Sequence, residues 1–181
     1  EADKAATLAI LEKWKQKVAG PNGEKPKMVF FCVSGGGLKA ATWAMEVLQQ
    51  ADSLTNGGFM EHTVLISGAS GGMMGTSYFR ELVLRKQQGE PIDLYHRQHV
   101  ADISKDLLNP ISFAIVTNDV FLPWASFEQG GQRYKKDRGY IFEKTFNENT
   151  HFRLDKAIGD YAQPEREAQI PMVFITPSII N

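Results

Sequence analysis

Short apolar runs alternate along the first half of the chain with segments in which apolar residues recur every three or four positions. Such runs indicate buried strands, and the run at residues 28–33 predicts a strand buried on both faces, whereas the recurring spacing indicates helices. The predicted elements are a strand, a helix, a second strand and a second helix, at residues 28–33, 39–51, 63–66 and 73–86. Glycine turns at residues 35–37 and 68–72 separate each strand from the helix that follows it. This order predicts parallel strands joined by right-handed crossovers in a layered α/β fold.

The rest of the chain has weaker patterns. The further elements predicted are three helices and a closing strand, at residues 3–18, 92–108, 153–162 and 172–176. Prolines and glycines interrupt residues 109–152, for which we expect irregular structure with short helices. Residues 107–127 are rich in large apolar side chains. They are expected to form either a lid or lipid-entry surface or a pair of core helices, and the pattern favours neither.

Composition narrows the function classes. The chain has 181 residues, about one domain. Its 20 Lys and Arg residues nearly balance 21 Asp and Glu residues, which argues against a dedicated nucleic-acid binder. A single cysteine, Cys32, excludes an internal disulfide framework and a cysteine-rich zinc site. No run of apolar residues is long enough to span a bilayer. We therefore expect a soluble or peripherally membrane-associated chain, with the compartment left open.

The second glycine turn carries the sharper chemical signal. Gly68-Ala69-Ser70-Gly71-Gly72 fits the pattern G-x-S-x-G between a predicted strand and a predicted helix. A sharp strand-to-helix corner exposes the serine hydroxyl, and the amides at the helix start face the negative charge that develops during acyl transfer. We therefore predict Ser70 as a nucleophile, with the Gly71 amide as an oxyanion donor. The alternative is a small-residue turn that only lets the strand and the helix pack closely.

The first glycine turn, Ser34-Gly35-Gly36-Gly37-Leu38-Lys39, is predicted to end a neighbouring parallel strand. Parallel strands finish at the same edge of a sheet, so the amides of this turn are placed to face Ser70 and hold an oxyanion. The same residues, read through Ala40, also fit the dinucleotide-binding pattern G-x-G-x-x-A. That alternative requires an acidic residue after the second strand, where the chain has Ile66-Ser67 instead. A phosphate-binding P-loop is excluded because Ala40, rather than Ser or Thr, follows Lys39.

Together the two turns, in this order, resemble those of the patatin-like phospholipases and the related cytosolic phospholipase A2 group. The resemblance covers roughly residues 28–85. It implies a three-layer α/β/α sandwich with a mainly parallel sheet, and a lipid acyl hydrolase with a Ser–Asp dyad and no cofactor. It also implies Ser70 as the nucleophile, Gly35, Gly36 and Gly37 as oxyanion donors, and a lipid ester or phospholipid as substrate. Lys39 stands where the family has arginine, and it keeps a positive charge for a lipid phosphate or head group.

The chain departs from the family in one important respect. The family's catalytic aspartate lies in a downstream Asp-Gly-Gly or Asp-Gly-Ala motif, and this chain contains no Asp-Gly dipeptide. We therefore expect residues 1–181 to be the N-terminal portion of a single, incomplete patatin-like domain. On that expectation a downstream part of the same protein completes the site, and these residues alone are weakly active or inactive. A local acid–histidine pair supplied by Asp119, Asp137 and His151 is an alternative, and a non-catalytic lipid-binding module is another.

Two clusters of polar residues could be either solvent-exposed surface or binding sites. His96 and His99 lie three residues apart on a predicted helix, with Asp93, Asp102 and Asp106 nearby. A polar helix face is the commoner arrangement, so we predict no metal site there. A basic cluster lies beside Tyr134 and Tyr140, and it consists of Arg133, Lys135, Lys136 and Arg138. It forms either a solvated loop, which we favour, or a contact for anionic head groups of a peripheral membrane.

Overall fold

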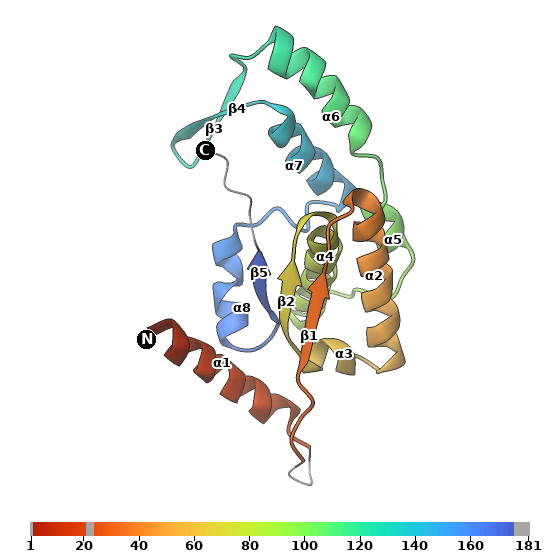
Figure 1. The fold of residues 1–181 in the computed structure, drawn as a ribbon, viewed down its shortest axis with the longest axis vertical. Helices are drawn as coiled ribbons and strands as arrows, with labels where there is room; N and C mark the ends of the chain where they lie inside the picture. Colours follow the sequence, from red (N-terminus) through yellow and green to blue (C-terminus); the bar gives the residue numbers. More distant parts are fainter. Residues whose placement is uncertain (1, 21–23, 176–181) are drawn as a thin grey trace.

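The computed structural model describes residues 2–20 and 24–175, and a parallel three-stranded sheet lies at its centre (Figure 1). The strands are β1 (Val29–Val33), β2 (Thr63–Gly68) and β5 (Met172–Ile175), in the order β1-β2-β5. Both neighbouring pairs are parallel, and Val33 lies opposite Gly68 where β1 and β2 end. The predicted α/β class and the parallel strands are therefore confirmed. Thr176, predicted to extend the last strand, lies outside the described residues.

Two long helices, α2 (Gly37–Leu54) and α4 (Ser70–Gln87), cover one face of the sheet. Both helices are present as predicted, but each begins within its glycine turn rather than after it. The short helix α3 (Gly58–His62) returns the chain from α2 to β2. Phe31, Ile66 and Val173 lie side by side in the strand register and face this pair of helices. The main hydrophobic core therefore lies between the sheet and the α2–α4 layer.

The opposite face of the sheet is only partly covered. Helix α1 (Ala2–Val18) packs there through Trp14, whose indole N–H donates to the carbonyl of Glu61 at 3.0 Å. The 3₁₀ turn η2 (Ile158–Tyr161) and helix α8 (Ala162–Arg166) flank β5. Phe30 and Phe174 remain 58% and 60% exposed on this face. The prediction that residues 28–33 are buried on both faces is therefore wrong for the second face.

The middle of the chain departs from the predicted helix at residues 92–108. Only α5 (Gln98–Ile103) forms, and α6 (Leu108–Ala114) begins separately. Aspartate side chains explain the breaks, because they accept backbone hydrogen bonds that a helix would use internally. The Asp93 carboxylate accepts from the amide of Tyr95 at 3.1 Å, and Asp106 accepts from the amide of Leu108 at 2.8 Å.

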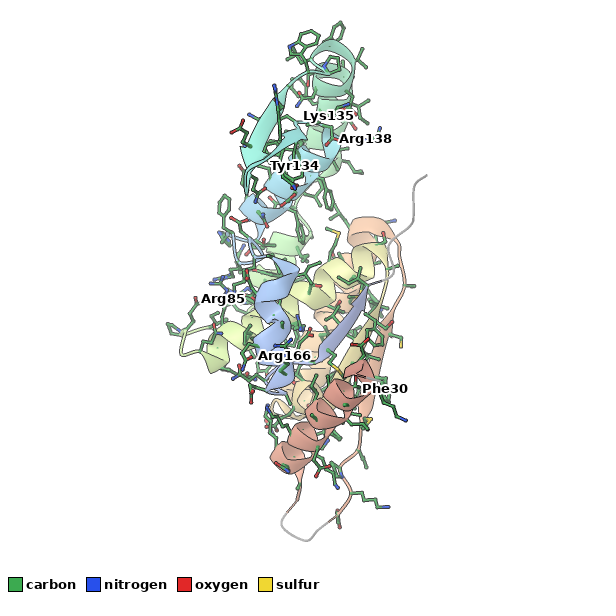
Figure 2. All side chains as sticks on the ribbon, turned by 90° about the vertical axis from the view of Figure 1, so that its left-hand side faces the viewer. Phe30, Arg85, Tyr134, Lys135, Arg138 and Arg166 are labelled. Atoms are coloured by element: carbon green, nitrogen blue, oxygen red, sulfur yellow. The ribbon has the colours of Figure 1, made fainter. Side chains whose placement is uncertain are left out.

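Residues 108–149 form an extension that we call the arm, which stands away from the sheet in two views (Figures 1 and 2). Its elements are α6, the π-helix η1 (Ile115–Phe121), the hairpin β3 (Ser126–Gln129) and β4 (Gln132–Lys135), and α7 (Arg138–Asn149). The hairpin and the 12-residue helix α7 correct the expectation of irregular structure. The apolar residues of α6 and η1 are mostly exposed, so they do not form core helices. None of the helices in the described ranges is both apolar and long enough to cross a bilayer.

The predicted helix at residues 153–162 is also wrong. Residues 151–154 form turns, and His151 and Phe152 both have a φ of 56°. Helical structure begins only at η2, where the Asp160 carboxylate accepts from the amide of Ala157 at 3.0 Å. Local side-chain hydrogen bonding again moves the helix start away from the position that apolar spacing predicts.

Candidate active site

Ser70 is the first residue of α4 and follows β2 across a single extended residue, Ala69. Its φ of 54° lies in the left-handed region, which a residue with a side chain adopts at a cost of about 1 kcal/mol or more. The serine is exposed. The predicted strand–turn–helix corner is therefore present, and its strained residue is the predicted nucleophile.

Four glycines of the second strand–helix unit touch the backbone of the first. A Cβ atom added at Gly68, Gly71, Gly72 or Gly75 would lie under 3.0 Å from a carbonyl oxygen of the β1–α2 unit. Atoms of real side chains essentially never approach so closely, so an alanine at any of these positions would push the two units apart. The carbonyls concerned are those of Val33, Ser34, Gly37 and Ala41. The G-x-S-x-G pattern includes the first three glycines but not Gly75, which extends the same close contact by one helical turn.

The first glycine turn lies directly against Ser70. A Cβ atom on Gly35 would stand 3.2 Å from the Ser70 Cβ and 3.7 Å from its Oγ. Gly36 and Gly37 have φ values of 146° and 60°, a backbone path that favours glycine. The structure therefore brings together Ser70, the predicted glycine turn and Gly71, as the parallel strand register requires.

Two helix N-termini meet at this corner. The residues that precede α2 and α4, Gly36 and Ala69, make no side-chain cap. The amides of each first turn have no partner within their own helix, and each N-terminus carries a partial positive charge of about half a unit. Lys39 is exposed in the first turn of α2 and adds a full charge at the same edge. This electrostatic environment favours an anion beside Ser70.

Buried ion pairs fix helix α4 behind the corner. Arg80 pairs with Glu165 and donates through Nε to the carbonyl of Pro171 at 2.9 Å. Burial raises the pKa of Glu165 although the charge of Arg80 opposes this effect. Glu81 is fully buried and accepts from Arg85 at 2.5 Å and Lys156 at 2.6 Å. The Glu81–Arg85 pair lies within α4, whereas the contacts of Arg80 and of Lys156 tie this helix to the segments beside β5.

The three candidate local bases are engaged elsewhere. The Asp137 carboxylate caps α7 by accepting from the amides of Gly139 and Tyr140, and Asp119 accepts from the amide of Arg138 at 3.3 Å. His151 lies 3.1 Å from Asp102 through Nε2. No hydrogen bond joins any of these side chains to Ser70 within residues 2–20 and 24–175. The structure therefore does not assemble the local base that the sequence allows as an alternative.

The network around Asp102 lies beside Tyr78, two turns along α4 and about 12 Å from Ser70 by helical rise. Burial acts to raise the pKa of Asp102, but hydrogen bonds from Lys105 and Gln98 outweigh it and hold that pKa below its usual value. Burial lowers the pKa of His99. Lys105, which also donates to Asp102, reaches the carbonyl of Asn149 at the end of the arm at 3.5 Å. We call this polar cluster the joint between the arm and the body, meaning the sheet with the helices packed on it.

The alternative metal site is not assembled at this joint. Both ring nitrogens of His99 have partners, the Tyr78 hydroxyl at 3.5 Å and the carbonyl of Asp93 at 2.9 Å. Over the described part of the chain, no three His, Cys, Asp or Glu side chains gather as a metal ion would require.

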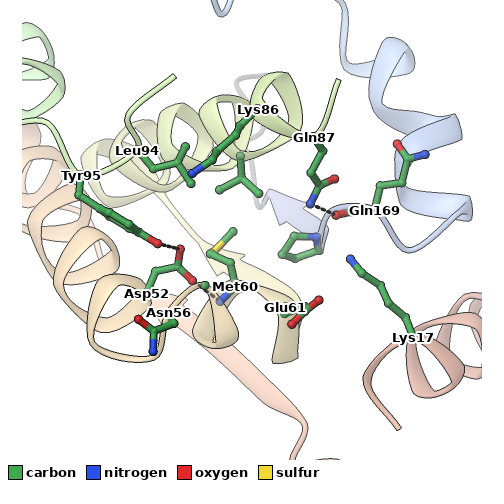
Figure 3. Close-up of a pocket in the computed structure, with 13 residues that line it drawn as sticks. Lys17, Asp52, Asn56, Met60, Glu61, Lys86, Gln87, Leu94, Tyr95 and Gln169 are labelled. Carbon is green, nitrogen blue, oxygen red and sulfur yellow. Dashed lines mark hydrogen bonds between the residues drawn. The ribbon is translucent and has the colours of Figure 1, made fainter. Parts of the chain in front are cut away.

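Ser70 lines neither of the two cavities described next, which lie near the sheet. One, of about 240 Å³, lies behind the glycine turn between Val33, Ser34, Trp43 and Gly72. The other, of about 310 Å³, lies at the opposite ends of the strands, beyond α3 (Figure 3). There the buried Asp52 accepts from the Tyr95 hydroxyl at 3.1 Å, and burial followed by the charge of Asp52 raises the pKa of Tyr95 to about 12. Ser70 itself is reached from open solvent.

Comparison of the chain with models of protein families, with curated proteins and with solved structures finds no match. The geometry of the Ser70 corner is therefore the basis on which a function can be inferred.

Proposed function

We propose that this protein is a serine hydrolase that cleaves carboxylic esters of lipids, with Ser70 as its nucleophile. The observation that carries the proposal is an exposed serine held at a φ of 54° where β2 meets α4, directly against a triple-glycine turn. A strained backbone conformation persists only where surrounding contacts hold it in place, and such conformations are concentrated at functional sites. The close backbone contacts of Gly68, Gly71 and Gly72 hold Ser70 in this conformation.

The chemistry follows from the position of the hydroxyl. Ser70 Oγ attacks the ester carbonyl, and the resulting oxyanion is held by amides of Gly35, Gly36, Gly37 and Gly71. Collapse of this intermediate releases the alcohol, and water then frees the fatty acid from the acyl-enzyme. A base must take the hydroxyl proton. None of the described acidic or histidine side chains is hydrogen-bonded to Ser70, and we assign this role to the downstream aspartate that the family resemblance implies.

The lipid part of the proposal rests on the resemblance of the two glycine motifs to the patatin-like phospholipases. On this proposal the three described strands belong to a three-layer α/β/α sandwich of that type. Lys39, exposed beside the corner, then contacts the phosphate or head group of the substrate. The partly exposed second face of the sheet, with Phe30 and Phe174, is compatible with further structure packing there.

Two observations favour the hydrolase over the nucleotide-binding alternative. Strand β2 ends at Gly68 and passes directly into the Ser70 corner, so no acidic residue follows it to hold a ribose. The glycine turn that would cradle a pyrophosphate is packed against Ser70 and Gly71 instead.

A fluorophosphonate probe tests the proposal, because it reacts with activated serines. The whole protein that carries this chain should be labelled, and Ser70→Ala should abolish the labelling. Ser104→Ala is a matched control, since Ser104 is also exposed but hydrogen-bonds only to the carbonyl of Ala101. Absence of labelling in the unmodified protein, or saturable binding of NAD or ATP at the glycine turn, would contradict the proposal.

The Gly35→Ala variant tests whether the position of Ser70 sets the rate of fluorophosphonate labelling. The added methyl group would stand 3.2 Å from the Ser70 Cβ, so the serine must shift by a few tenths of an ångström. A misplacement of about 1 Å can reduce a reaction rate about 100-fold, so this smaller shift is expected to reduce it by up to about 10-fold. The labelling rate should fall by this amount while the fold, followed by circular dichroism, stays intact. A labelling rate equal to that of the unmodified protein would show that Gly35 does not limit the position of Ser70.

A further inference from the structure

The arm carries a row of large apolar side chains that face solvent. Its members each expose more than half of their surface, and they are Leu108, Phe113, Val116, Val120, Phe121 and Trp124. Phe113, Val116 and Val120 recur at spacings of three and four residues, so they share one side of α6 and η1. The intervening Ala114 is buried. Exposed large apolar side chains gathered in one segment are typical of an interaction site.

A basic cavity adjoins this row. Its volume is about 220 Å³, and it is lined by Leu122 and Pro123 together with Lys135, Lys136 and Arg138. Two carboxylates, Asp119 and Asp137, also line it, and both already accept backbone hydrogen bonds from the start of α7. Tyr134, Lys135 and Arg138 lie on the arm in Figure 2, far from Phe30 on the sheet.

The two lysines of this cavity have charge to offer a ligand. Arg138 is 3.8 Å from Asp119, whereas in the described ranges no carboxylate lies within salt-bridge distance of Lys135 or Lys136. The Lys136 ammonium instead lies 5.8 Å from the ring of Tyr140. Lys135 and Lys136 thus line the cavity without a salt bridge, and with Arg138 they outnumber its two carboxylates, so the cavity is suited to a phosphate group.

We propose that the arm docks on an anionic phospholipid membrane. The apolar row enters the boundary between head groups and acyl chains, and the cavity of Lys135 and Lys136 receives lipid phosphates. Apolar side chains beside basic ones are the combination by which peripheral segments bind anionic bilayers. A second copy of this chain would cover the apolar row but supply no phosphate to the lysines. The inference goes beyond the proposed hydrolase, because it concerns a surface remote from Ser70 and holds whether or not Ser70 reacts.

The geometry gives this docking a direction. The strands of the sheet run toward the arm, so their carboxyl ends, where Ser70 lies, are on the arm's side of the molecule (Figure 1). A membrane bound by the arm therefore faces the edge of the sheet that carries the serine, and it is remote from α3 at the other end.

Tryptophan fluorescence tests the docking with a control built into the chain. Trp43 on α2 and Trp124 on the arm are both 71% exposed, and Trp14 is buried. With vesicles of phosphatidylcholine and phosphatidylglycerol, the Trp43→Phe variant, which keeps Trp124, should show a blue shift and quenching by brominated acyl chains. The Trp124→Phe variant, which keeps Trp43, should show neither. Equal quenching in both variants, or none in either, would overturn the proposal.

Neutralising the two lysines of the cavity tests the role of charge. Lys135→Gln with Lys136→Gln should weaken vesicle binding by about 30-fold, because each lysine at an anionic surface contributes roughly fivefold. The same change at Lys25 and Lys27, which are exposed in the segment before β1, should leave binding unchanged, because this segment enters the sheet at the end away from the arm (Figure 1). Vesicles of phosphatidylcholine alone, or high salt, should weaken binding of the unmodified protein. Free inorganic phosphate should compete only weakly, since it cannot engage the apolar row.

Two further variants separate membrane docking from hydrolysis and from self-association. Phe121→Ser should weaken binding about tenfold without unfolding the protein, because the side chain is already 67% exposed. Ser70→Ala should bind vesicles as the unmodified protein does, so failure of the hydrolase would not imitate failure of docking. If Phe121→Ser instead converts a dimer to a monomer in sedimentation and leaves vesicle binding unchanged, the apolar row is an interface between copies and the proposal is wrong.

Discussion

The Ser70 corner and the arm differ in what holds their backbones in place. At the corner, main-chain atoms of two strand–helix units touch through glycines, and the helix behind them is fixed by buried ion pairs. In the arm, the large apolar side chains of α6 and η1 face solvent, and helix α7 contributes no fully buried residue. The corner can therefore hold a strained serine, whereas the arm can accept substitutions and meet another surface.

The comparison predicts its largest effect at Gly71. Gly71→Ala would place a methyl group against the carbonyl of Gly37, so the two helices must separate and the protein should lose about 3 kcal/mol or more of unfolding free energy. Gly131→Ala, in the arm hairpin, meets no atom within 4 Å and should cost only about 1 kcal/mol, for its φ of 77°. Urea titration of both variants measures the difference. Similar losses at the two positions would remove the distinction between corner and arm.

A second pair of glycine-to-alanine changes, at Gly75 in α4 and at Gly159, separates the effect of close contact from that of helix propensity. Alanine ordinarily stabilises a helix interior relative to glycine by about 1 kcal/mol. Gly75→Ala in α4 should nevertheless destabilise the protein, since its methyl group would meet the carbonyl of Ala41. Gly159→Ala, with open space and no positive φ, should change the unfolding free energy by less than about 0.5 kcal/mol.

A smaller effect, of opposite sign, is expected at the nucleophile. Ser70→Gly relieves the positive φ and should stabilise the protein by about 1 kcal/mol, while abolishing fluorophosphonate labelling. Asn56→Gly relieves a similar φ of 52° far from the corner and should leave labelling intact. Thermal unfolding of both variants tests this exchange of stability for reactivity. A destabilised Ser70→Gly variant would show that the serine side chain is structural.

The joint between body and arm should respond to acid. The folded-state pKa of His99 lies below the ordinary value of 6.5, so the unfolded chain binds its proton first as the pH falls. Stability is therefore complete above about pH 6.5 and declines below it, and Asp102, whose pKa is also lowered, adds a further loss below about pH 4. His99→Gln should flatten the first decline in urea titrations, whereas His96→Gln, at an exposed position, should not. If both substitutions flattened the decline in unfolding free energy equally, His99 would not be the group responsible for it.

The sequence predicted the corner well because its signals are local. Apolar runs and glycine turns specify β1, α2, β2 and α4, and the parallel register of the strands then brings Ser70 to the first turn. The sequence could not show how closely the backbones approach, so the close contact of Gly75 with the carbonyl of Ala41 was not predicted. It also could not supply the base, because none of the three candidates is near Ser70 in the described structure.

The arm was predicted poorly for a physical reason. Prolines and glycines interrupt its sequence, and the backbone hydrogen bonds that Asp106, Asp119 and Asp137 accept decide where its elements begin. The same composition fits a lid and a core, and only the exposure of Phe113, Phe121 and Trp124 separates the two. The partial cover of β1 was missed because an apolar run looks alike whether one face is packed or both.

Cys32, the chain's single thiol, is exposed on β1 two residues before Ser34, where the glycine turn begins. One maleimide-linked spin label or fluorophore can therefore be attached there without mutating any other residue. It would report distances from the strand end to a second probe on the arm or in a bilayer. The molecule thus carries its own attachment point for following how the serine corner moves relative to a lipid surface.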